Sequence, residues 1–156
     1  MPAKPGGEKV VTTNRKAYHD YFVEEEIEAG VVLYGSEIKS IRQGRVTLRD
    51  AYARIDNGEL WLVGAHISPY EHSGAFFNHE PDRPRKLLVH HRELDYLRSK
   101  VEASGYTLVP VRMVLRKGRA KVDIALAKGK KLYDKRAALA ERDAKRNIER
   151  ELRERG

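Results

Sequence analysis

The sequence predicts a mainly β fold: an antiparallel barrel of about six strands with two to three α-helices flanking its ends or openings. Two pairs of strand-like segments flank the tight-turn signals Asp56-Asn57-Gly58 and Arg116-Lys117-Gly118, so each pair is expected to form a hairpin. Two other segments carry apolar residues at helical spacing. The expected strands and helices do not alternate along the chain as they would in a parallel sheet. An antiparallel barrel therefore accounts best for the pattern.

The first half of the chain is expected to contain a strand, a helix and one hairpin. Residues 1–13 hold two prolines and two glycines and are predicted to form a flexible leader. Residues 18–27 are aromatic, β-branched and charged, which favours a strand. The spacing of Val31, Tyr34, Ile38 and Ile41 predicts a helix, and Gly44 is placed to end it. The hairpin then joins residues 51–55 to residues 60–67.

The second half is expected to contain a long loop, a second helix and the other hairpin. Residues 69–86 include three prolines and few apolar residues, which indicates a loop. Residues 90–104 carry apolar residues on one helical face and end at Gly105. Residues 107–115 and 119–127 form the hairpin. In its second strand, alternate side chains are expected to point inward, namely those of Ala120, Val122, Ile124 and Leu126. The side chains between them are expected to point toward solvent or a ligand, namely those of Arg119, Lys121 and Asp123.

The charge of the chain is distributed unevenly. Lys and Arg number 31, Asp and Glu number 23, and the net charge is +8. Residues 1–115 carry 16 basic and 16 acidic side chains, whereas residues 116–156 carry 15 basic and 7 acidic ones. A basic end on a neutral body is typical of proteins that bind a polyanion, most often nucleic acid. The alternative is a solvated helical extension that has no partner.

Other function classes lose support because their sequence signals are missing. The 156 residues suffice for one domain with an appendage, and the absence of Cys excludes disulfides, a thiolate nucleophile and a Cys-based zinc site. There is no phosphate-binding loop, no dinucleotide fingerprint and no H-E-x-x-H motif. Glu71, His72 and His79 match no known metal spacing. We therefore expect no catalytic residue, metal, cofactor or small-molecule substrate. No apolar run is long enough for a membrane span and residues 1–9 lack a secretory signal, so we expect no membrane association and a cytoplasmic location.

The C-terminal segment differs from everything before it. Residues 136–155 are rich in Ala, Glu, Lys and Arg, which favour a helix, but only Ile148 and Leu152 are large apolar residues on its apolar face. Ordering about twenty residues costs about 1–2 kcal/mol per residue, far more than two apolar side chains return. The segment is therefore predicted to be disordered alone and helical on a polyanion. A helix that packs on the body through Ile148 and Leu152 is the alternative.

Four segments carry cations, and three of them combine these with aromatic side chains, glycines or an amide, a mixture that suits RNA. The three are Asn14-Arg15-Lys16-Ala17-Tyr18-His19-Asp20-Tyr21, Gly35-Ser36-Glu37 with Lys39 and Arg42, and Lys128-Gly129-Lys130-Lys131. The fourth, Arg83-Pro84-Arg85-Lys86, is a basic loop edge. Glu37 is not expected to bind phosphate, because its carboxylate is negatively charged. It is expected either to accept hydrogen bonds from base amino groups or a 2′-hydroxyl, or to hold its neighbours in place. Each segment alone could be ordinary surface charge, but tight binding needs many such contacts.

Read in order, the sequence resembles the SsrA-binding protein (small protein B) family from about residue 10 to the C-terminus. The motifs that carry the resemblance are Asn14-Arg15-Lys16-Ala17 with His19-Asp20-Tyr21, Glu28-Ala29-Gly30 with Gly35-Ser36-Glu37-Ile38-Lys39-Ser40, His66-Ile67-Ser68-Pro69-Tyr70, Asn78-His79-Glu80-Pro81, Arg85-Lys86-Leu87-Leu88-Val89-His90, Gly105-Tyr106-Thr107-Leu108-Val109-Pro110, Lys121-Val122-Asp123-Ile124, and Leu126-Ala127-Lys128-Gly129-Lys130-Lys131 through Tyr133-Asp134-Lys135-Arg136.

The resemblance implies an OB-like barrel and an RNA-binding adaptor without catalytic activity. It implies binding to the tRNA-like domain of tmRNA (SsrA) and delivery of that RNA to stalled bacterial ribosomes for trans-translation, with ribosome rescue and tagging of the nascent peptide for degradation. The tail would be disordered when free and helical in the messenger channel next to the decoding site of the small subunit. Elongation factor Tu would join through aminoacylated tmRNA.

The resemblance and the candidate segments together predict the site residues. The RNA-binding residues are Asn14, Arg15, Lys16, His19, Tyr21, Gly35, Ser36, Glu37, Lys39, Asn78, Arg85, Lys86, Lys121, Lys128, Gly129, Lys130 and Lys131. The ribosome-binding tail residues are Tyr133, Asp134, Lys135, Arg136, Lys145, Arg146, Ile148, Arg150 and Arg153. The domains are a leader (1–13), an RNA-binding barrel (14–132) and a basic tail (133–156). An RNA-modifying or nucleolytic enzyme and a ribosomal-type protein with a structural tail are the competing hypotheses.

Overall fold

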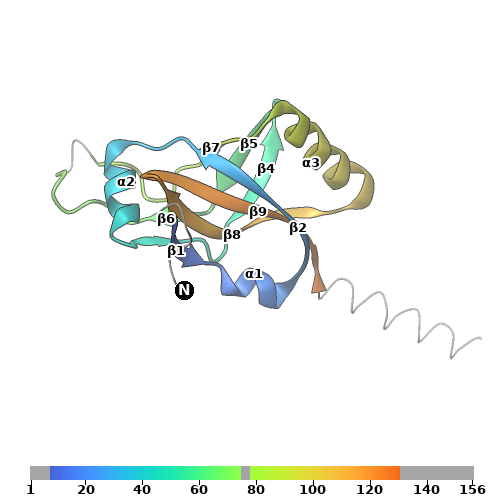
Figure 1. Cartoon of the computed structure of the whole chain (residues 1–156), viewed down its shortest axis with the longest axis horizontal. Helices are drawn as coiled ribbons and strands as arrows, with labels where there is room; N and C mark the ends of the chain where they lie inside the picture. Colours follow the sequence, from blue (N-terminus) through green and yellow to red (C-terminus); the bar gives the residue numbers. More distant parts are fainter. Residues whose placement is uncertain (1–7, 75–77, 131–156) are drawn as a thin grey trace, which may run out of the picture.

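The computed structural model describes residues 8–74 and 78–130, which form a mainly β structure with three helices (Figure 1). Their order along the chain is β1 (Glu8–Thr13), α1 (Arg15–Asp20), β2 (Tyr21–Val31), α2 (Gly35–Arg42), β3 (Val46–Thr47), β4 (Tyr52–Asp56), β5 (Glu59–Val63), β6 (His66–Ile67), β7 (Arg85–Leu88), α3 (His91–Ser104), β8 (Thr107–Arg116) and β9 (Arg119–Gly129). Within these ranges, none of the helices has both the length and the apolar character that crossing a bilayer requires.

Seven strands form one antiparallel sheet in the order β1-β8-β4-β5-β7-β2-β9. Strand β9 also pairs with β8, so the pairings that leave β8 through β4 return to it through β2 and β9. Strand β1 pairs with residues 112–116 of β8, on the same edge that β4 meets at Leu108 and opposite the edge that pairs with β9. The short strands β3 and β6 form a separate pair that lies close to α2 (Figure 1).

The core is filled by the inward-facing side chains of the sheet and by one face of each long helix. Leu60 and Leu62 of β5, Met113 of β8 and Val122 of β9 are at most 1 % exposed. The predicted inward set of β9, Ala120, Val122, Ile124 and Leu126, is buried and is thereby confirmed. Ala125 and Ala127 point to the other face and are also buried, because α1 covers that end of the sheet through Ala17.

Both predicted hairpins are confirmed, with two-residue turns. Asp56 pairs with Glu59 and Arg116 pairs with Arg119, so each loop consists of the two residues between them. These residues have positive φ angles: 50° and 73° at Asn57 and Gly58, and 51° and 77° at Lys117 and Gly118. This conformation matches the right-handed twist of paired strands, which is why Asn-Gly is a strong hairpin signal.

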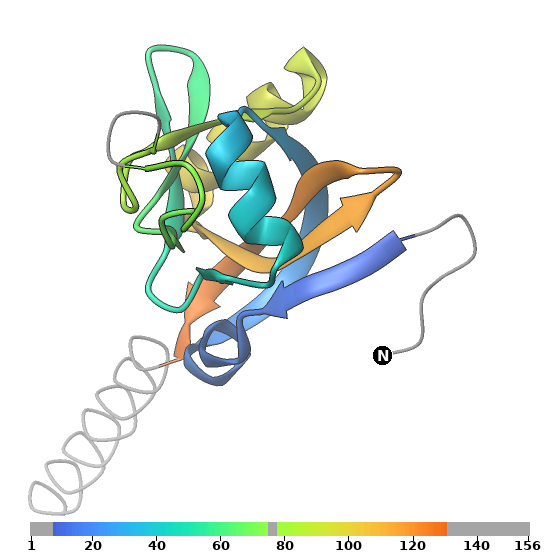
Figure 2. The ribbon, with the colours of Figure 1, turned by 90° about the vertical axis from the view of Figure 1, so that its left-hand side faces the viewer.

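The two predicted helices are confirmed as α2 and α3, with adjusted boundaries. Helix α2 begins only at Gly35, because Val31 still belongs to β2, and Gly44 follows its end with φ 75°. Helix α3 ends at Gly105 in the left-handed conformation and buries Leu94 and Leu97. Figure 2 shows α2 in front of the sheet, with the β8–β9 turn on one side and the loop before β7 on the other.

Two predictions about the N-terminal region are wrong. Residues 8–13 are strand β1 rather than part of a leader, because β8 supplies hydrogen-bonding partners about one hundred residues away in sequence. Residues 18–20 belong to α1 rather than to a strand. Asn14 caps this helix, and the burial of Ala17 against β8 and β9 stabilises it, which the local pattern did not indicate.

Two predictions about the middle of the chain are also corrected. Residues 60–67 do not form one strand, because Gly64 has a φ of 82° and separates β5 from β6. A Cβ at Gly64 would lie 3.3 Å from the carbonyl oxygen of Asp50, so glycine suits this turn sterically as well. The predicted loop 69–86 is shorter than expected, since Arg85 and Lys86 begin strand β7 between β5 and β2.

Candidate nucleic-acid interface

The first predicted RNA-binding segment forms α1, and its first residue has a structural role. Asn14 is 5 % exposed, and its amide nitrogen donates to the carbonyl oxygens of Leu48 and Pro110, both at 2.9 Å. Its side-chain oxygen accepts from the backbone amide of Ala17 at 3.3 Å. Asn14 therefore fastens α1 to the sheet, and in this structure it does not present its amide to RNA.

Asn14→Ala is expected to lower the free energy of unfolding by about 2–3 kcal/mol, because two buried carbonyls and a helix cap lose their partner. Urea denaturation measures this change. The matched control is Arg15→Ala on the exposed side of the same helix, expected to stay within about 0.5 kcal/mol of wild type. Equal effects of the two substitutions would contradict the role assigned to Asn14.

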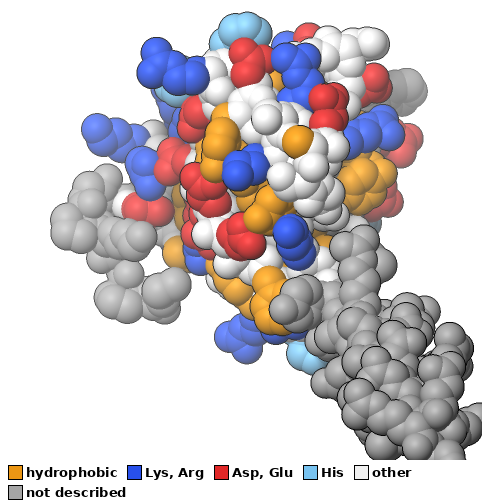
Figure 3. Space-filling view, turned by 90° about the vertical axis from the view of Figure 1, so that its right-hand side faces the viewer, with side chains coloured by type: hydrophobic (Ala, Val, Ile, Leu, Met, Phe, Trp, Pro, Cys, Tyr) orange, Lys and Arg blue, Asp and Glu red, His pale blue; other side chains and the backbone are white. Residues whose placement is uncertain are grey.

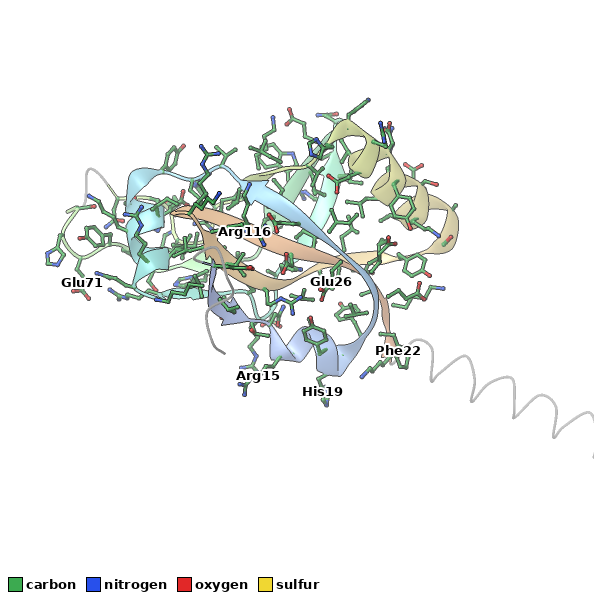
Figure 4. All side chains as sticks on the ribbon, in the orientation of Figure 1. Arg15, His19, Phe22, Glu26, Glu71 and Arg116 are labelled. Carbon is green, nitrogen blue, oxygen red and sulfur yellow. The ribbon has the colours of Figure 1, made fainter. Side chains whose placement is uncertain are left out.

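The exposed residues of α1 meet the end of β9 and make one basic surface. Arg15 and His19 point away from the sheet (Figure 4), and Lys16 pairs with Asp50 at 2.5 Å. Lys130 donates to the carbonyl oxygen of Tyr18 at 3.0 Å and lies 5.2 Å from the ring centre of Phe22. We call Arg15, Lys16, His19 and Lys130 the α1 surface. Tyr21 and Gly129 pair directly beneath it, and Lys128 lies 4.6 Å from the ring centre of Tyr106.

The centre of the second segment is a buried ionic cluster around Glu37. Glu37 and Arg85 are both fully buried, and Arg85 Nε donates to Glu37 Oε2 at 2.7 Å. Arg83 donates to the same carboxylate from Nε at 3.0 Å and from Nη2 at 2.5 Å. The remaining donors of Arg85 bond the carbonyl oxygens of Ala65, Glu80 and Pro81. The cluster thus joins α2 to β7 and to the turns before β6 and β7.

Hydrogen bonding keeps this cluster ionised despite its burial. Burial alone would raise the pKa of Glu37, but hydrogen bonds from Arg83, from the Tyr34 amide and from Arg85 outweigh it and lower that pKa. Burial lowers the pKa of Arg85, and Glu37 partly offsets this effect. Glu37 accepts four hydrogen bonds, from the Tyr34 amide, from Arg83 and from Arg85, so no acceptor site of its carboxylate is left for RNA. Glu37 and Arg85 are both fully buried in this structure, which favours the alternative that Glu37 holds its neighbours in place, and their direct contact with RNA stays a prediction.

Two residues of the predicted RNA-binding set hold the loop before β7 in place: Ser36 links it to α2 through His79, and Asn78 bonds within the loop. Ser36 is 8 % exposed and its hydroxyl lies 2.8 Å from His79 Nδ1, while His79 Nε2 donates to the Ile67 carbonyl at 2.9 Å. Asn78 bonds the amide and carbonyl of Tyr70. Ser36 and Asn78 are thus occupied structurally, whereas Lys39 is exposed and lies 5.3 Å from the ring centre of Tyr70.

A groove with an apolar floor and a cationic rim lies beside α2. It has a volume of about 400 Å³ and lies between β2, α2, Leu88 and the β8–β9 turn. Its floor is Gly30, Val31, Leu33, Ile38 and Ala120, and its cations are Arg42, Arg119 and Lys121. Leu88 is 52 % exposed at its edge and adds apolar surface to the groove.

The absence of a side chain at Gly30 leaves one corner of the groove open. A Cβ at Gly30 would lie 3.5 Å from Leu88 Cβ and 3.6 Å from Lys121 Nζ, so any larger side chain would fill this corner of the groove. Lys121 was predicted from the outward alternation of β9, and Arg119 shares that signal. Arg42 was named only as a cation beside Glu37. Leu88 was missed as a candidate residue, because its relation to Lys121 depends on pairings β2–β7 and β2–β9 that local sequence does not specify.

The remaining predicted residues are dispersed. Lys86 pairs with Glu59 at 3.2 Å and is not part of the groove or of the α1 surface. Gly35 is exposed at the start of α2. Lys131 and all the predicted tail residues, from Tyr133 to Arg153, lie outside the described residues.

The outer face of β2, β9 and β8 is charged but internally paired. Arg112 lies 2.5 Å from Glu26 and 3.1 Å from Asp123, and Arg116 pairs with Glu8 and Glu28. Figure 4 labels Glu26 and Arg116 on this face. At the α3 end, Figure 3 shows acidic and basic side chains intermixed rather than a patch of one sign. Lys16 and His19 of the α1 surface also pair with carboxylates, those of Asp50 and Asp20. Among the described surfaces, the groove, together with Arg15 and Lys130 of the α1 surface, is thus the better candidate for a polyanion.

Comparison with known proteins identifies the family. The family model described as "SmpB protein" matches residues 11–154, which is nearly the whole chain. The chain belongs to the SmpB family. Named relatives include the SsrA-binding protein of Roseiflexus castenholzii, 64% identical over 150 residues that cover 96% of this chain and 95% of the relative. The SsrA-binding protein of Desulfitobacterium hafniense is 59% identical over 150 residues, covering 96% of both chains.

A solved structure supports the same assignment. A chain in the structure described as "tmRNA-SmpB: a journey to the center of the bacterial ribosome" superposes with a TM-score of 0.65 and is 47% identical in sequence. The match covers 78% of this chain and 84% of that one. At this identity the likeness extends beyond the fold to the SmpB family itself.

Within the described ranges, no group of three or more His, Asp or Glu side chains is placed to hold a metal ion. Of Glu71, His72 and His79, the loop residues that carry possible metal ligands, two have other partners. Glu71 pairs with Arg45 at 2.8 Å, and His79 bonds Ser36 and Ile67.

Proposed function

We propose that this chain binds the tRNA-like domain of tmRNA and delivers it to stalled ribosomes for trans-translation, which rescues the ribosome and tags the nascent peptide. Its relatives are named for binding SsrA, and the matching solved structure concerns tmRNA and SmpB in the ribosome. The observation on this chain that carries the proposal is the groove, where Arg42, Arg119 and Lys121 surround apolar side chains. Cations there can bind phosphates while the floor takes the faces of bases or riboses.

The fold supports an architecture suited to this task. The pairings that return from β9 to β8 support a closed, OB-like barrel of six strands, to which β1 is added. We propose that the RNA-binding domain covers residues 14–132 together with β1. We also propose that residues 133–156 are a separate basic tail, disordered when free and helical in the messenger channel of the ribosome.

We propose that the chain acts as an adaptor rather than as an enzyme. None of the interactions described above pairs a nucleophile with a base in an open site, and the family assignment supports RNA binding. Elongation factor Tu is proposed as a further partner that joins through aminoacylated tmRNA, in the bacterial cytoplasm. Turnover of RNA that is lost on His19→Ala would favour the alternative of an RNA-processing enzyme.

Arg42→Ala with Lys121→Ala is expected to weaken binding to the isolated tRNA-like domain by at least about tenfold at 0.15 M salt and to make its salt dependence shallower. Two fewer phosphate contacts release fewer counterions, so the slope of log K against log salt falls by about 1.4–1.8. Fluorescence anisotropy over a salt series measures both quantities.

The matched control removes two cations from α3, Arg98→Ala with Lys100→Ala. It changes the net charge equally, and we expect little change in either affinity or slope. Equal weakening by the two pairs would mean that total charge, not the groove, determines binding. Wild-type binding that did not decline as salt rises would contradict the phosphate-based proposal.

A further inference from the structure

The aromatic ring of Tyr34, immediately before α2, has no structural role that explains its exposure. The residue is 60 % exposed, more than any other large apolar or aromatic residue among those described. Its ring packs against Arg83, whose guanidinium carbon lies 4.2 Å from the ring centre. Within residues 8–74 and 78–130, the ring of Tyr34 contacts no other ring or cation. Burial of core surface therefore does not account for an aromatic side chain at this position.

The ring is nevertheless held in a defined place. The Tyr34 amide donates to Glu37 Oε1 at 2.7 Å, and its carbonyl accepts from the amides of Glu37 and Ile38 at 3.1 and 3.2 Å. Arg83, which supports the ring, is itself fixed by two hydrogen bonds to the buried Glu37. A ligand that stacks on Tyr34 would thus meet a preorganised surface, so little side-chain freedom remains to be lost on binding.

Tyr34 lies in the segment of the chain that supplies one side of the groove. It is the extended N-cap residue of α2, and Ile38 and Arg42 of that helix line the groove. Leu33, its neighbour in the chain, lines the groove as well.

We infer that Tyr34, backed by Arg83, is a stacking platform for an unpaired RNA base, an inference that rests on the proposed function. An aromatic face binds every base, whereas the neighbouring cations select a polyanion over a neutral or basic protein surface. The base belongs either to tmRNA or to ribosomal RNA. Both offer unpaired bases, so the experiment must separate the two sources.

The test compares wild type with Tyr34→Ala, Tyr34→Leu and Tyr34→Phe. One arm measures affinity for the isolated tRNA-like domain, and the other measures affinity of the tmRNA-bound chain for stalled ribosomes. Stacking predicts about tenfold weaker binding for Ala and Leu in one arm, which identifies the source of the base, and at most about twofold for Phe. Tyr96→Ala, an exposed tyrosine on α3, is the matched control and is expected to bind as wild type does.

Three outcomes separate this inference from the proposed function. If wild type binds in both arms and Ala and Leu match it in each, the stacking platform is wrong and the proposed function stands. If Leu retains wild-type affinity while Ala does not, the site is apolar rather than a stacking surface, which also overturns the inference. If wild type binds neither RNA nor ribosome, the proposed function itself fails. Urea denaturation confirms that each variant is folded.

Discussion

Glu37→Ala is expected to lower the free energy of unfolding by about 3–5 kcal/mol, because it leaves the fully buried Arg85 without its counter-ion. The loss does not stop at one pair, since Arg83 also donates to this carboxylate. Helix α2 would lose its attachment to β7. We expect the RNA affinity to fall as well, but as a consequence of displaced Arg42 and Ile38 rather than of a lost RNA contact.

Chemical denaturation measures the effect, and an exposed ion pair provides the control. Glu71→Gln removes the partner of Arg45 at the surface, where such pairs contribute about 0–1 kcal/mol. Comparable losses for Glu37→Ala and Glu71→Gln would contradict the buried cluster. So would a Glu37→Ala protein of wild-type stability that had lost RNA binding, because that pattern would restore a direct contact.

The pH dependence of the unfolding free energy provides a second test of the ionic cluster around Glu37. The pKa of Glu37 is lowered in the folded state, so its ionisation stabilises the fold above the ordinary carboxyl pKa. That contribution is lost as the pH falls through the lowered folded-state value. The stability difference between wild type and Glu37→Gln should therefore be full at neutral pH and narrow in acid, as measured by unfolding at a series of pH values.

Removal of residues 137–156 is expected to abolish ribosome rescue while leaving affinity for the tRNA-like domain within about threefold of wild type. These twenty residues carry six basic and five acidic side chains, so deleting them barely changes the net charge. The salt slope for tmRNA should therefore be preserved, because it depends on the number of phosphates that are neutralised. Rescue should fail, since the proposed tail can no longer fold in the messenger channel.

Two assays on one truncated protein test this division of labour. Anisotropy with the tRNA-like domain reports RNA binding, and peptide tagging in a reconstituted translation reaction reports rescue. A matched control replaces Glu141 and Glu149 by Gln in the full chain, which changes charge but keeps the length, and should preserve tagging. Loss of tmRNA affinity together with rescue would mean that the tail belongs to the RNA-binding domain.

Sequence patterns predicted the fold well wherever the signal was local. The two hairpins depend on two-residue turns whose positive φ angles are encoded by Asn57-Gly58 and Lys117-Gly118 themselves. Strand β1 and helix α1 were missed because their stability comes from partners distant in the chain: β8 for the strand, and the Val109 and Ala125 surface for Ala17. Local propensity carries no information about such partners.

The candidate site was predicted less well, because it depends on which side chains are exposed. The period of two along β9 indicated that Lys121 faces away from the core, and Lys121 lines the groove, but the sequence could not distinguish the exposed Lys39 from the buried Arg85. Both are cations in motifs that resemble the family, yet Arg85 is enclosed by Glu37 and three carbonyl groups. The tolerance of a folded protein for a buried charge depends on such partners.

The continuity of β9 gives the molecule a built-in spacer. Its partners β2 and β8 contain bulges, between Val23 and Glu25 and between Pro110 and Arg112, whereas β9 runs without an extra residue from Lys121 in the groove to Gly129 beneath the α1 surface. Eight residues of strand span about 26 Å. A nucleic acid that binds both the groove and the α1 surface must therefore have contact points at about this separation. The length of β9 thus restricts which nucleic acids can bind both surfaces.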